Sequence, residues 1–238
     1  MDAILEIDQV QKRFGGFTAL SGVNLSVARG ERLGLIGPNG SGKTTLISCV
    51  SGALFNDGGA IRFEGRDVSR LKAYRRTRLG IARSFQIPRP FRSMTVIENL
   101  LVPCAWVGGS DGRKARAEAM AILERMHLAD KADAATGQLS QVELRKMELA
   151  RAMAAKPKLL ISDEAMAGLA GAEVDEVLEI LFDLNRMGIT IIMIEHIMQA
   201  VMAFSQRVVC LDTGQIICEG TPEQVVANPQ VQRAYLGD

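Results

Sequence analysis

The chain has 238 residues, enough to bury one sizeable α/β core but not two full domains of ordinary size. Its 28 basic and 27 acidic residues leave a net charge of +1, which argues against a global electrostatic attraction to nucleic acid or to an anionic membrane surface. The longest apolar runs have the length of strands and fall far short of a bilayer span. We therefore expect a soluble protein of one domain with an insertion, whose membrane contacts are local and specific.

Four cysteines are spread over the chain without a CxxC pair, and no secretory signal is recognised at its start. They are Cys49, Cys104, Cys210 and Cys218. We expect reduced thiols in the cytosol, with Cys49 and Cys210 buried because they lie in apolar stretches.

The first predicted elements form a small β-subdomain. An alternating strand covers Ile4 to Val10, a Gly15-Gly16 turn follows, and a second strand lies near Val23 to Val27. This pattern predicts antiparallel pairing. The apolar run Leu33 to Ile36 then leads into a glycine-rich loop, and a helix is predicted from about Lys43.

The glycine-rich loop reads GPNGSGKTT, which is the pattern of a phosphate-binding P-loop. Its glycines let consecutive backbone N–H groups point at the β- and γ-phosphates, and the next helix adds the positive end of its dipole. Lys43 would supply a charge and Thr44 a hydroxyl ligand for Mg²⁺. A chance turn before a helix is the alternative, and the preceding strand disfavours it. The predicted nucleotide ligands here are Gly37, Pro38, Asn39, Gly40, Ser41, Gly42, Lys43, Thr44 and Thr45.

A helix is predicted over Ala115 to Leu128, where apolar residues recur at helical spacing. The stripe consists of Ala119, Ile122, Leu123 and Met126. We assign this helix to a helical insertion, with His127 as a surface residue.

Two buried strands are predicted further along, at Lys158 to Ser162 and at Ile189 to Ile194. The helix between them carries an apolar stripe of Val174, Val177, Leu178 and Leu181, and Gly188 is its expected C-cap. Strand, helix and strand in this order predict a parallel sheet. Two short strands around Asp212 to Gly214 follow, and then a helix with Thr221 as N-cap and Pro222 at its first position.

The first of these buried strands ends in two carboxylates, Asp163 and Glu164. Asp163 can hold the water shell of Mg²⁺, and Glu164 can polarise an attacking water. An acidic pair at a strand end more often marks a solvated turn or a helix cap. Its place downstream of a P-loop favours the catalytic interpretation.

The motifs together resemble the ATP-binding subunits of ABC transporters. Among these subunits, they resemble the branch that serves branched-chain amino acid importers. PFRSMTVIENLLV, at Pro90 to Val102, and the tail from Glu219 to Asp238 resemble this branch in particular. The resemblance implies an α/β fold, the P-loop NTPase fold of ABC ATPases, with an antiparallel β-subdomain and a helical insertion. It implies one domain over 1–238, with a RecA-like core and β-subdomain at 1–86 and 156–238 and a helical subdomain at 87–155.

The resemblance also assigns roles that the residues alone do not establish. Phe14 stands where the family stacks an aromatic ring on adenine, although an aromatic near a strand end is ordinarily core. Gln86, in Ser84-Phe85-Gln86, matches the glutamine that joins the metal site to the insertion, and His196 matches the switch histidine at the γ-phosphate. The implied catalytic residues are Glu164, His196, Lys43 and Gln86, and the implied metal ligands are Thr44, Gln86 and Asp163.

The family signature is altered, because Leu139 to Glu143 reads LSQVE where the family has LSGGQ or a close variant. The signature offers a serine, backbone N–H groups and a helix N-terminus to the γ-phosphate bound by the opposite subunit. Ser140 keeps that role, whereas Val142 adds a β-branched side chain and Glu143 a negative charge. Ser140 and Glu143 also fit a capping box, so the segment can equally serve to cap its helix. Two smaller departures, Ala165 and Ala170, affect the same subunit-facing region.

The resemblance implies an ATPase, using ATP and Mg²⁺, that drives an importer for branched-chain amino acids or related small polar solutes. The implied partners are transmembrane permease subunits, a second ATPase subunit and, indirectly, a substrate-binding protein, without nucleic acid. Because the Walker side is complete and the signature side is altered, we expect a different chain as the second ATPase, with a homodimer as the alternative. The expected location is the cytoplasmic face of the cell membrane.

Other classes of nucleotide-binding protein fit less well. An ABC ATPase that acts on DNA or ribosomes usually carries two cassettes or a long coiled-coil insertion, and a GTPase requires an N-K-x-D element. The sequence has none of these. A regulatory or non-transport ABC ATPase with low turnover is the alternative that stays open.

Overall fold

The computed structural model describes residues 2–85, 87–107 and 109–236, the last without its side chain. An antiparallel sheet forms the N-terminal part, in the strand order β2-β1-β4-β5. Its strands are β1 (Ala3–Phe14), β2 (Phe17–Ala28), β4 (Gly58–Phe63) and β5 (Arg66–Asp67). The predicted antiparallel pairing around Gly15-Gly16 is confirmed, and both strands are longer than predicted.

The second sheet has six strands in the order β10-β9-β3-β8-β7-β6. Neighbours are parallel except β10, which pairs antiparallel with β9. The strands are β3 (Arg32–Ile36), β6 (Ile81–Ser84), β7 (Leu159–Asp163), β8 (Thr190–Ile194), β9 (Arg207–Asp212) and β10 (Gln215–Gly220). The predicted parallel pairing of the two buried strands is confirmed, because β7 lies beside β8 with Asp163 opposite Ile194.

The parallel sheet is buried on both faces, and alternation along its strands sends neighbouring side chains into different clusters. On β8, Ile192 and Ile194 join a cluster with the antiparallel sheet and helix α1 (Lys43–Ser51). Ile191 and Met193 of the same strand join a cluster of helices on the other face. The sheet therefore lies between the two hydrophobic clusters, and its strands end between them.

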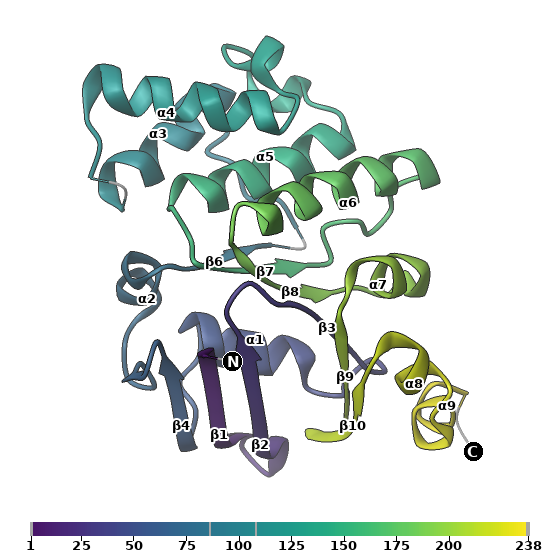
Figure 1. Ribbon diagram of the computed structural model, residues 1–238. Coiled ribbons are helices and arrows are strands. Elements are labelled where there is room, and N and C mark those ends of the chain that lie inside the picture. The colour runs from purple at the N-terminus through teal and green to yellow at the C-terminus, as the bar shows by residue number, and fades with distance from the viewer. Residues whose placement is uncertain (1, 86, 108, 237–238) are drawn as a thin grey trace.

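Helices cover that other face, with α3, α4 and α5 stacked at the end of the molecule farthest from β1 and β2 (Figure 1). They are α3 (Val96–Trp106), α4 (Gly112–Arg125) and α5 (Gln141–Ala154), joined by 3₁₀ turns at Ala129–Lys131 and Thr136–Gln138. The predicted helix at 115–128 is present and ends three residues earlier. His127 follows it with an exposed side chain, 3.6 Å from a carboxylate oxygen of Glu176.

The remaining helices are α2 (Ala73–Leu79), α6 (Gly171–Arg186), α7 (Met198–Phe204), α8 (Pro222–Val226) and α9 (Pro229–Leu236). Thr221 caps α8 and Pro222 is its first residue, as predicted. The predicted C-cap of α6 was wrong by one residue: Met187 occupies that position, and Gly188 follows it with φ +91°. The left-handed backbone that favours glycine lies just beyond the cap.

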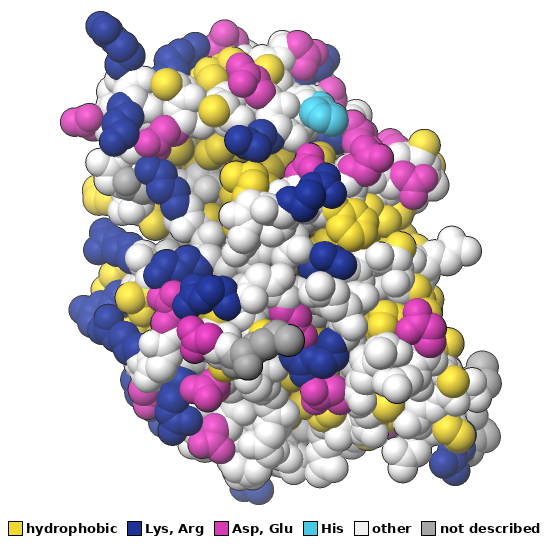
Figure 2. Space-filling view, in the orientation of Figure 1, with side chains coloured by type: hydrophobic (Ala, Val, Ile, Leu, Met, Phe, Trp, Pro, Cys, Tyr) yellow, Lys and Arg dark blue, Asp and Glu magenta, His cyan; other side chains and the backbone are white. Residues whose placement is uncertain are grey.

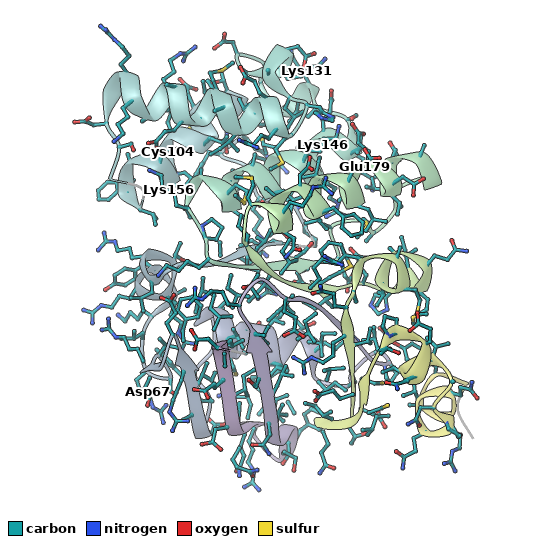
Figure 3. The ribbon with its side chains drawn as sticks, viewed as in Figure 1. Asp67, Cys104, Lys131, Lys146, Lys156 and Glu179 are labelled. Atoms are coloured by element: carbon teal, nitrogen blue, oxygen red, sulfur yellow. The ribbon has the colours of Figure 1, made fainter. Side chains whose placement is uncertain are left out.

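The cysteines are free, and Cys49, Cys104 and Cys210 are buried. Figure 3 shows Cys104 within the stacked helices. Burial raises the pKa of the Cys49 thiol to about 11 and that of Cys210 to about 12. Both predicted core thiols are therefore protonated at neutral pH.

A fully buried arginine joins α1 to α2. The Arg76 guanidinium donates to the carbonyls of Cys49 and Val50, which belong to the last turn of α1, and to those of Leu71 and Ser69. Burial lowers the pKa of Arg76. No ion pair to a carboxylate is recorded for it within the described residues, so backbone carbonyls that α1 leaves unpaired at its end hold this charge.

We predict that Arg76→Leu lowers the free energy of unfolding by about 3 kcal/mol, because several buried carbonyls lose their donor. Urea denaturation measures the effect. Arg75→Leu is the matched control, since Arg75 is exposed on the same helix and should change stability by less than about 0.5 kcal/mol. Equal effects of the two substitutions would contradict a structural role for the buried guanidinium.

Candidate functional site

The glycine loop runs from the end of β3 to the start of α1, and two of its glycines are required by space. Gly37 has φ +148°, and a Cβ there would lie 2.0 Å from the Leu211 carbonyl oxygen. Gly42 has φ +107°, and a Cβ there would lie 2.7 Å from the Ala19 carbonyl oxygen. Larger residues would push the loop off β9 and β2, so the path of the loop depends on these two glycines.

The loop leaves donors ready for an anion. Gly42 stands at the N-cap of α1 without a side chain to cap the helix, so backbone N–H groups of the first turn face outward. The Lys43 ammonium donates to the carbonyl oxygens of Gly37 at 2.7 Å and Pro38 at 2.9 Å. Burial lowers the pKa of Lys43, while the nearby carboxylates of Glu164 and Asp163 oppose that shift. The buried Ser41 hydroxyl has no hydrogen-bond partner within the described residues.

A hollow of about 270 Å³ lies over the loop and brings together most residues predicted to act on nucleotide. Phe14, Glu164 and His196 line it beside residues 39–45. Phe17 lines it too; it pairs with Phe14 across the β1–β2 turn, and both rings are exposed, by 61% and 47%. A hollow lined both by an anion cradle and by exposed aromatic rings suits a nucleotide with its phosphates and base.

Glu164 and His196 meet at the ends of β7 and β8. His196 Nε2 lies 3.2 Å from Glu164 Oε1. Glu164 has φ +49°, a left-handed conformation that is uncommon for a residue with a Cβ and is often found at functional sites. Its backbone N–H donates to the Ile194 carbonyl at 2.9 Å, which holds the strained residue against the neighbouring strand.

Glu195, the first residue after β8, is directed into the protein interior and not into the hollow. It is buried, and its carboxylate accepts a hydrogen bond from the Met166 N–H at 2.9 Å. Burial raises the pKa of Glu195 to about 7. The hydrogen bond from Met166 to Glu195 therefore links the segment after β7 to the segment after β8. It adds a second link at these strand ends to the one from Glu164 to Ile194.

Asp163 is buried and forms an ion pair that the sequence did not reveal. Its Oδ2 lies 2.7 Å from an Arg83 guanidinium nitrogen, and another nitrogen of Arg83 lies 3.1 Å from the Ser48 hydroxyl on α1. The charge of Asp163 is thus partly balanced by the protein itself. Its assignment as a metal ligand stays a prediction.

The predicted Mg²⁺ site has few protein ligands. Within the residues that the structure describes, no cluster of three or more His, Cys, Asp or Glu side chains could hold a metal ion. Magnesium is typically bound by one or two protein oxygens together with substrate phosphates and water. A hydroxyl at Thr44 and a carboxylate at Asp163 fit that donor set, with the nucleotide completing it.

Among the described residues with a predicted role, the lining of this hollow lacks Gly37, Pro38, Asp163 and Ser140. Gln86 lies outside the described residues. Ser140 is exposed at the N-terminus of α5 and does not line the hollow. The predicted capping box is confirmed: the Ser140 hydroxyl accepts from the Glu143 N–H at 3.3 Å, and the Glu143 carboxylate accepts from the Ser140 N–H at 2.7 Å. The pKa of Glu143 is lowered by this bond, so the carboxylate is ionised.

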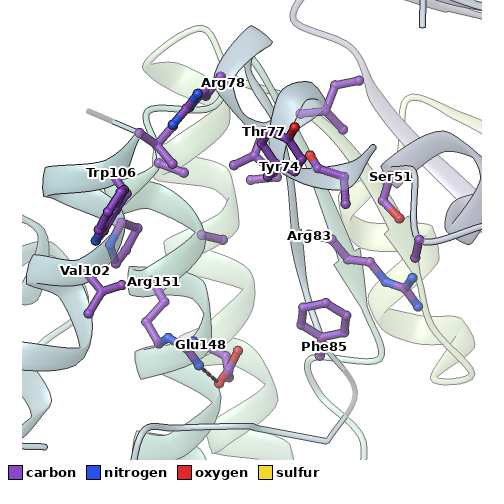
Figure 4. A pocket seen from close by; sticks show the side chains of 18 of the residues that line it. Ser51, Tyr74, Thr77, Arg78, Arg83, Phe85, Val102, Trp106, Glu148 and Arg151 are labelled. Carbon is purple, nitrogen blue, oxygen red and sulfur yellow. Dashed lines mark hydrogen bonds and ion pairs between the residues drawn. The ribbon is translucent and has the colours of Figure 1, made fainter. Parts of the chain in front are cut away.

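A second, larger hollow of about 570 Å³ lies between α2 and β6 on one side and α3 and α5 on the other. Figure 4 shows aromatic and basic side chains around it. Tyr74, Phe85, Phe91 and Trp106 are exposed by 52%, 44%, 42% and 73%. We call this hollow the aromatic groove. On the same side of the molecule, Lys and Arg side chains gather around α2 (Figure 2).

One residue reaches from the aromatic groove to the strand end beside the nucleotide hollow. The Arg83 guanidinium lies 5.2 Å from the centre of the Phe85 ring, which lines the groove, and pairs with Asp163 on the other side. Arg83 therefore connects the aromatic groove to Asp163, which directly precedes Glu164 of the nucleotide hollow.

Sequence reasoning missed Phe17, Arg83 and the groove. A second phenylalanine three residues after Phe14 was a signal for the first. Arg83 sits in a short strand that carries no clear periodicity, and the groove is formed by elements distant in sequence, so neither had a local signal.

A family model described as ABC transporter matches residues 20–167, and a model of branched-chain amino acid ATP-binding cassette transporters matches residues 215–238. The high-affinity branched-chain amino acid transport ATP-binding protein BraF of Pseudomonas aeruginosa is 37% identical, over 99% of this chain and 98% of the relative. The corresponding LivG of Escherichia coli K12 is 38% identical over the same shares. A probable LivG of Archaeoglobus fulgidus is 38% identical, over 98% of this chain and 95% of the relative.

Solved structures agree with these relatives. A nucleotide-free ATP-binding cassette from an ABC transporter superposes with a TM-score of 0.91 at 33% identity, covering 99% of this chain and 100% of the other. A cassette in its ADP conformation gives the same TM-score and identity over 100% of both chains. None of the helices in the described part of the chain is long and apolar enough to cross a membrane. The chain belongs to the ABC transporter family, among its branched-chain amino acid transport ATP-binding proteins.

Proposed function

We propose that the chain binds and hydrolyses ATP to energise an ABC importer for branched-chain amino acids or related small polar solutes. The hollow that joins the glycine loop to Glu164 and His196 is the observation that carries this proposal. The named relatives, which are branched-chain amino acid transport proteins, support the solute class.

The phosphates would lie against the N–H groups of residues 39–45, with adenine against Phe14. Lys43 would exchange its two loop carbonyls for phosphate oxygens, a gain because the buried ammonium then contacts a full negative charge. Thr44 and Asp163 would hold Mg²⁺, which when bound neutralises charge on the β- and γ-phosphates. Gln86 is proposed as a further ligand on family position alone.

Glu164 would orient and polarise the attacking water, and His196, 3.2 Å away, would contact the γ-phosphate. The strained backbone of Glu164 supports this role, because the fold holds its side chain toward the hollow rather than into the core. ATP would drive closure of two subunits by binding the closed state more tightly, and hydrolysis would reopen them.

The second ATPase subunit is proposed to be a different chain. A signature that completes another subunit's site must present N–H groups to phosphate, and here Glu143 places an ionised carboxylate in that region. A partner with a regular signature would complete this chain's site, while Leu139 to Glu143 would face the partner's site. The same carboxylate supports one other function, a regulatory subunit of low turnover.

The aromatic groove is proposed as the surface for the permease. An exposed aromatic patch with a basic rim is typical of a protein interface, and it would place the chain peripherally at the cytoplasmic face of the membrane. We propose 87–155 as the helical subdomain and 1–86 with 156–238 as the core with its β-subdomain, so that the groove lies where they meet.

The catalytic roles are tested by two substitutions. Lys43→Ala should weaken ATP binding about 10- to 100-fold, because a charge-assisted contact is lost. Glu164→Gln should leave ATP affinity near that of the original chain and lower hydrolysis about 100-fold or more. Nucleotide titration and phosphate release measure the two effects. Hydrolysis by the Glu164→Gln variant at the original rate would remove Glu164 from the mechanism.

The signature hypothesis is tested by Glu143→Gln, which keeps an oxygen to cap α5 and removes the charge. We expect ATP hydrolysis by the homodimer to rise about fivefold, because the repulsion between position 143 and the phosphate of the opposite subunit falls by roughly 1 kcal/mol. Glu98→Gln, in the Thr95 capping box of α3, is the matched control and should change nothing. No change at Glu143 would leave capping as the segment's role. Equal rates at both sites of a reconstituted heterodimer would contradict the asymmetric model.

The permease surface is tested by Trp106→Ala. Trp106 is the one tryptophan of the sequence and is 73% exposed in the groove. We expect co-purification with the permease to fall about tenfold or more, and the fluorescence of the original chain to shift to shorter wavelength on assembly. Met187→Ala, which removes an exposed side chain outside the groove, is the control. Unchanged co-purification of the Trp106→Ala variant would show that the permease docks elsewhere.

A further inference from the structure

The C-terminal segment has no part in the function proposed so far, although residues 215–238 match the branch-specific family model. In the structure, α9 packs back on the core through Val231, which is 4% exposed. Val231 shares a hydrophobic cluster with Ile36 and Cys210. Ile36 is the last residue of β3, directly before the glycine loop, so the segment is anchored beside the nucleotide site.

Two hydrogen bonds connect this C-terminal part to the start and the middle of the glycine loop. The Gly37 N–H donates to the Tyr235 hydroxyl oxygen on α9 at 2.8 Å. The Gly214 N–H, in the turn between β9 and β10, donates to the Ser41 carbonyl at 2.9 Å. The Gly214 carbonyl in turn accepts from the Ser21 N–H on β2 at 2.9 Å. The loop is therefore held between the tail and the β-subdomain.

The Gly37 N–H needs the acceptor that Tyr235 supplies. The parallel ladder between β3 and β9 ends at the pair Ile36 and Cys210, one residue before Gly37. A backbone N–H left without an acceptor at this position would be costly. The contact joins residues 198 positions apart in the sequence.

The same glycine is held on its other side by the nucleotide-binding lysine. The Gly37 carbonyl accepts from the Lys43 ammonium, which in the proposed function leaves for the phosphates. When Lys43 leaves, the hydrogen bond that the Gly37 N–H donates to the Tyr235 hydroxyl oxygen still fixes Gly37. The loop can then keep its shape without the lysine.

We propose that α9 braces the glycine loop and that Tyr235 is a positioning residue of the nucleotide site. The inference rests on the proposed function, because it assumes that the loop binds ATP. Tyr235 does not line the nucleotide hollow. It acts through Gly37, by keeping the loop's N–H groups oriented for the phosphates before nucleotide arrives.

Tyr235→Phe tests the brace, because it removes the hydroxyl and keeps the ring. We expect the KM for ATP to rise about fivefold with kcat changed by less than about twofold, the size of effect that one uncharged hydrogen bond supports. Hydrogen exchange of the amides in residues 37–45 should accelerate in the nucleotide-free protein. Gln230→Ala, on the exposed side of α9, should leave KM and exchange unchanged.

Tyr235→Ala is the second variant and should raise KM further, since the ring is lost as well. If both substitutions of Tyr235 lower only the unfolding midpoint, with KM and loop exchange as in the original chain, the tail is structural and the brace is overturned. If the original chain itself fails to bind ATP, the proposed function fails instead. The two failures are thus told apart by the unsubstituted protein.

Discussion

The close approach of the glycine loop to β9 is the constraint on which the rest of the site depends. A Cβ at Gly37 would lie 2.0 Å from the Leu211 carbonyl oxygen, so the loop and the strand fit together only with glycine there. This approach lets the parallel sheet, whose strands end at one edge, bring Glu164 and His196 over the loop from β7 and β8. The geometry of the nucleotide site therefore depends first on backbone packing at Gly37 and only then on charged side chains.

Charge is then distributed so that the site is balanced before substrate arrives. The Lys43 ammonium donates hydrogen bonds to carbonyl oxygens of its own loop, and the charge of Asp163 is paired with that of Arg83. In the proposed function each of these groups would exchange its protein partner for phosphate or metal. The altered signature differs, because the Glu143 carboxylate is occupied in capping α5 and would meet phosphate only across a subunit interface.

The sequence was sufficient where the information was local. The loop GPNGSGKTT, the antiparallel pairing of β1 and β2 around Gly15-Gly16, the capping box at Ser140 and the cap of α8 at Thr221 are all set by nearby residues, and the structure confirms their geometry. The Arg83 to Asp163 pair joins residues 80 positions apart, and the Tyr235 contact joins residues 198 apart. A pattern in one sequence cannot reveal such pairs, because their contact depends on strand order.

The aromatic groove affects the solubility and turnover of the chain before it assembles with its partners. Four aromatic rings and a basic rim on one face give the unassembled protein an exposed surface that favours non-specific association. Subunits made in excess would be prone to self-association and open to chaperones or proteases that recognise exposed apolar surface. If the permease docks on the groove as proposed, assembly would hide these rings, and the supply of permease would also limit how much of this chain accumulates in the cell.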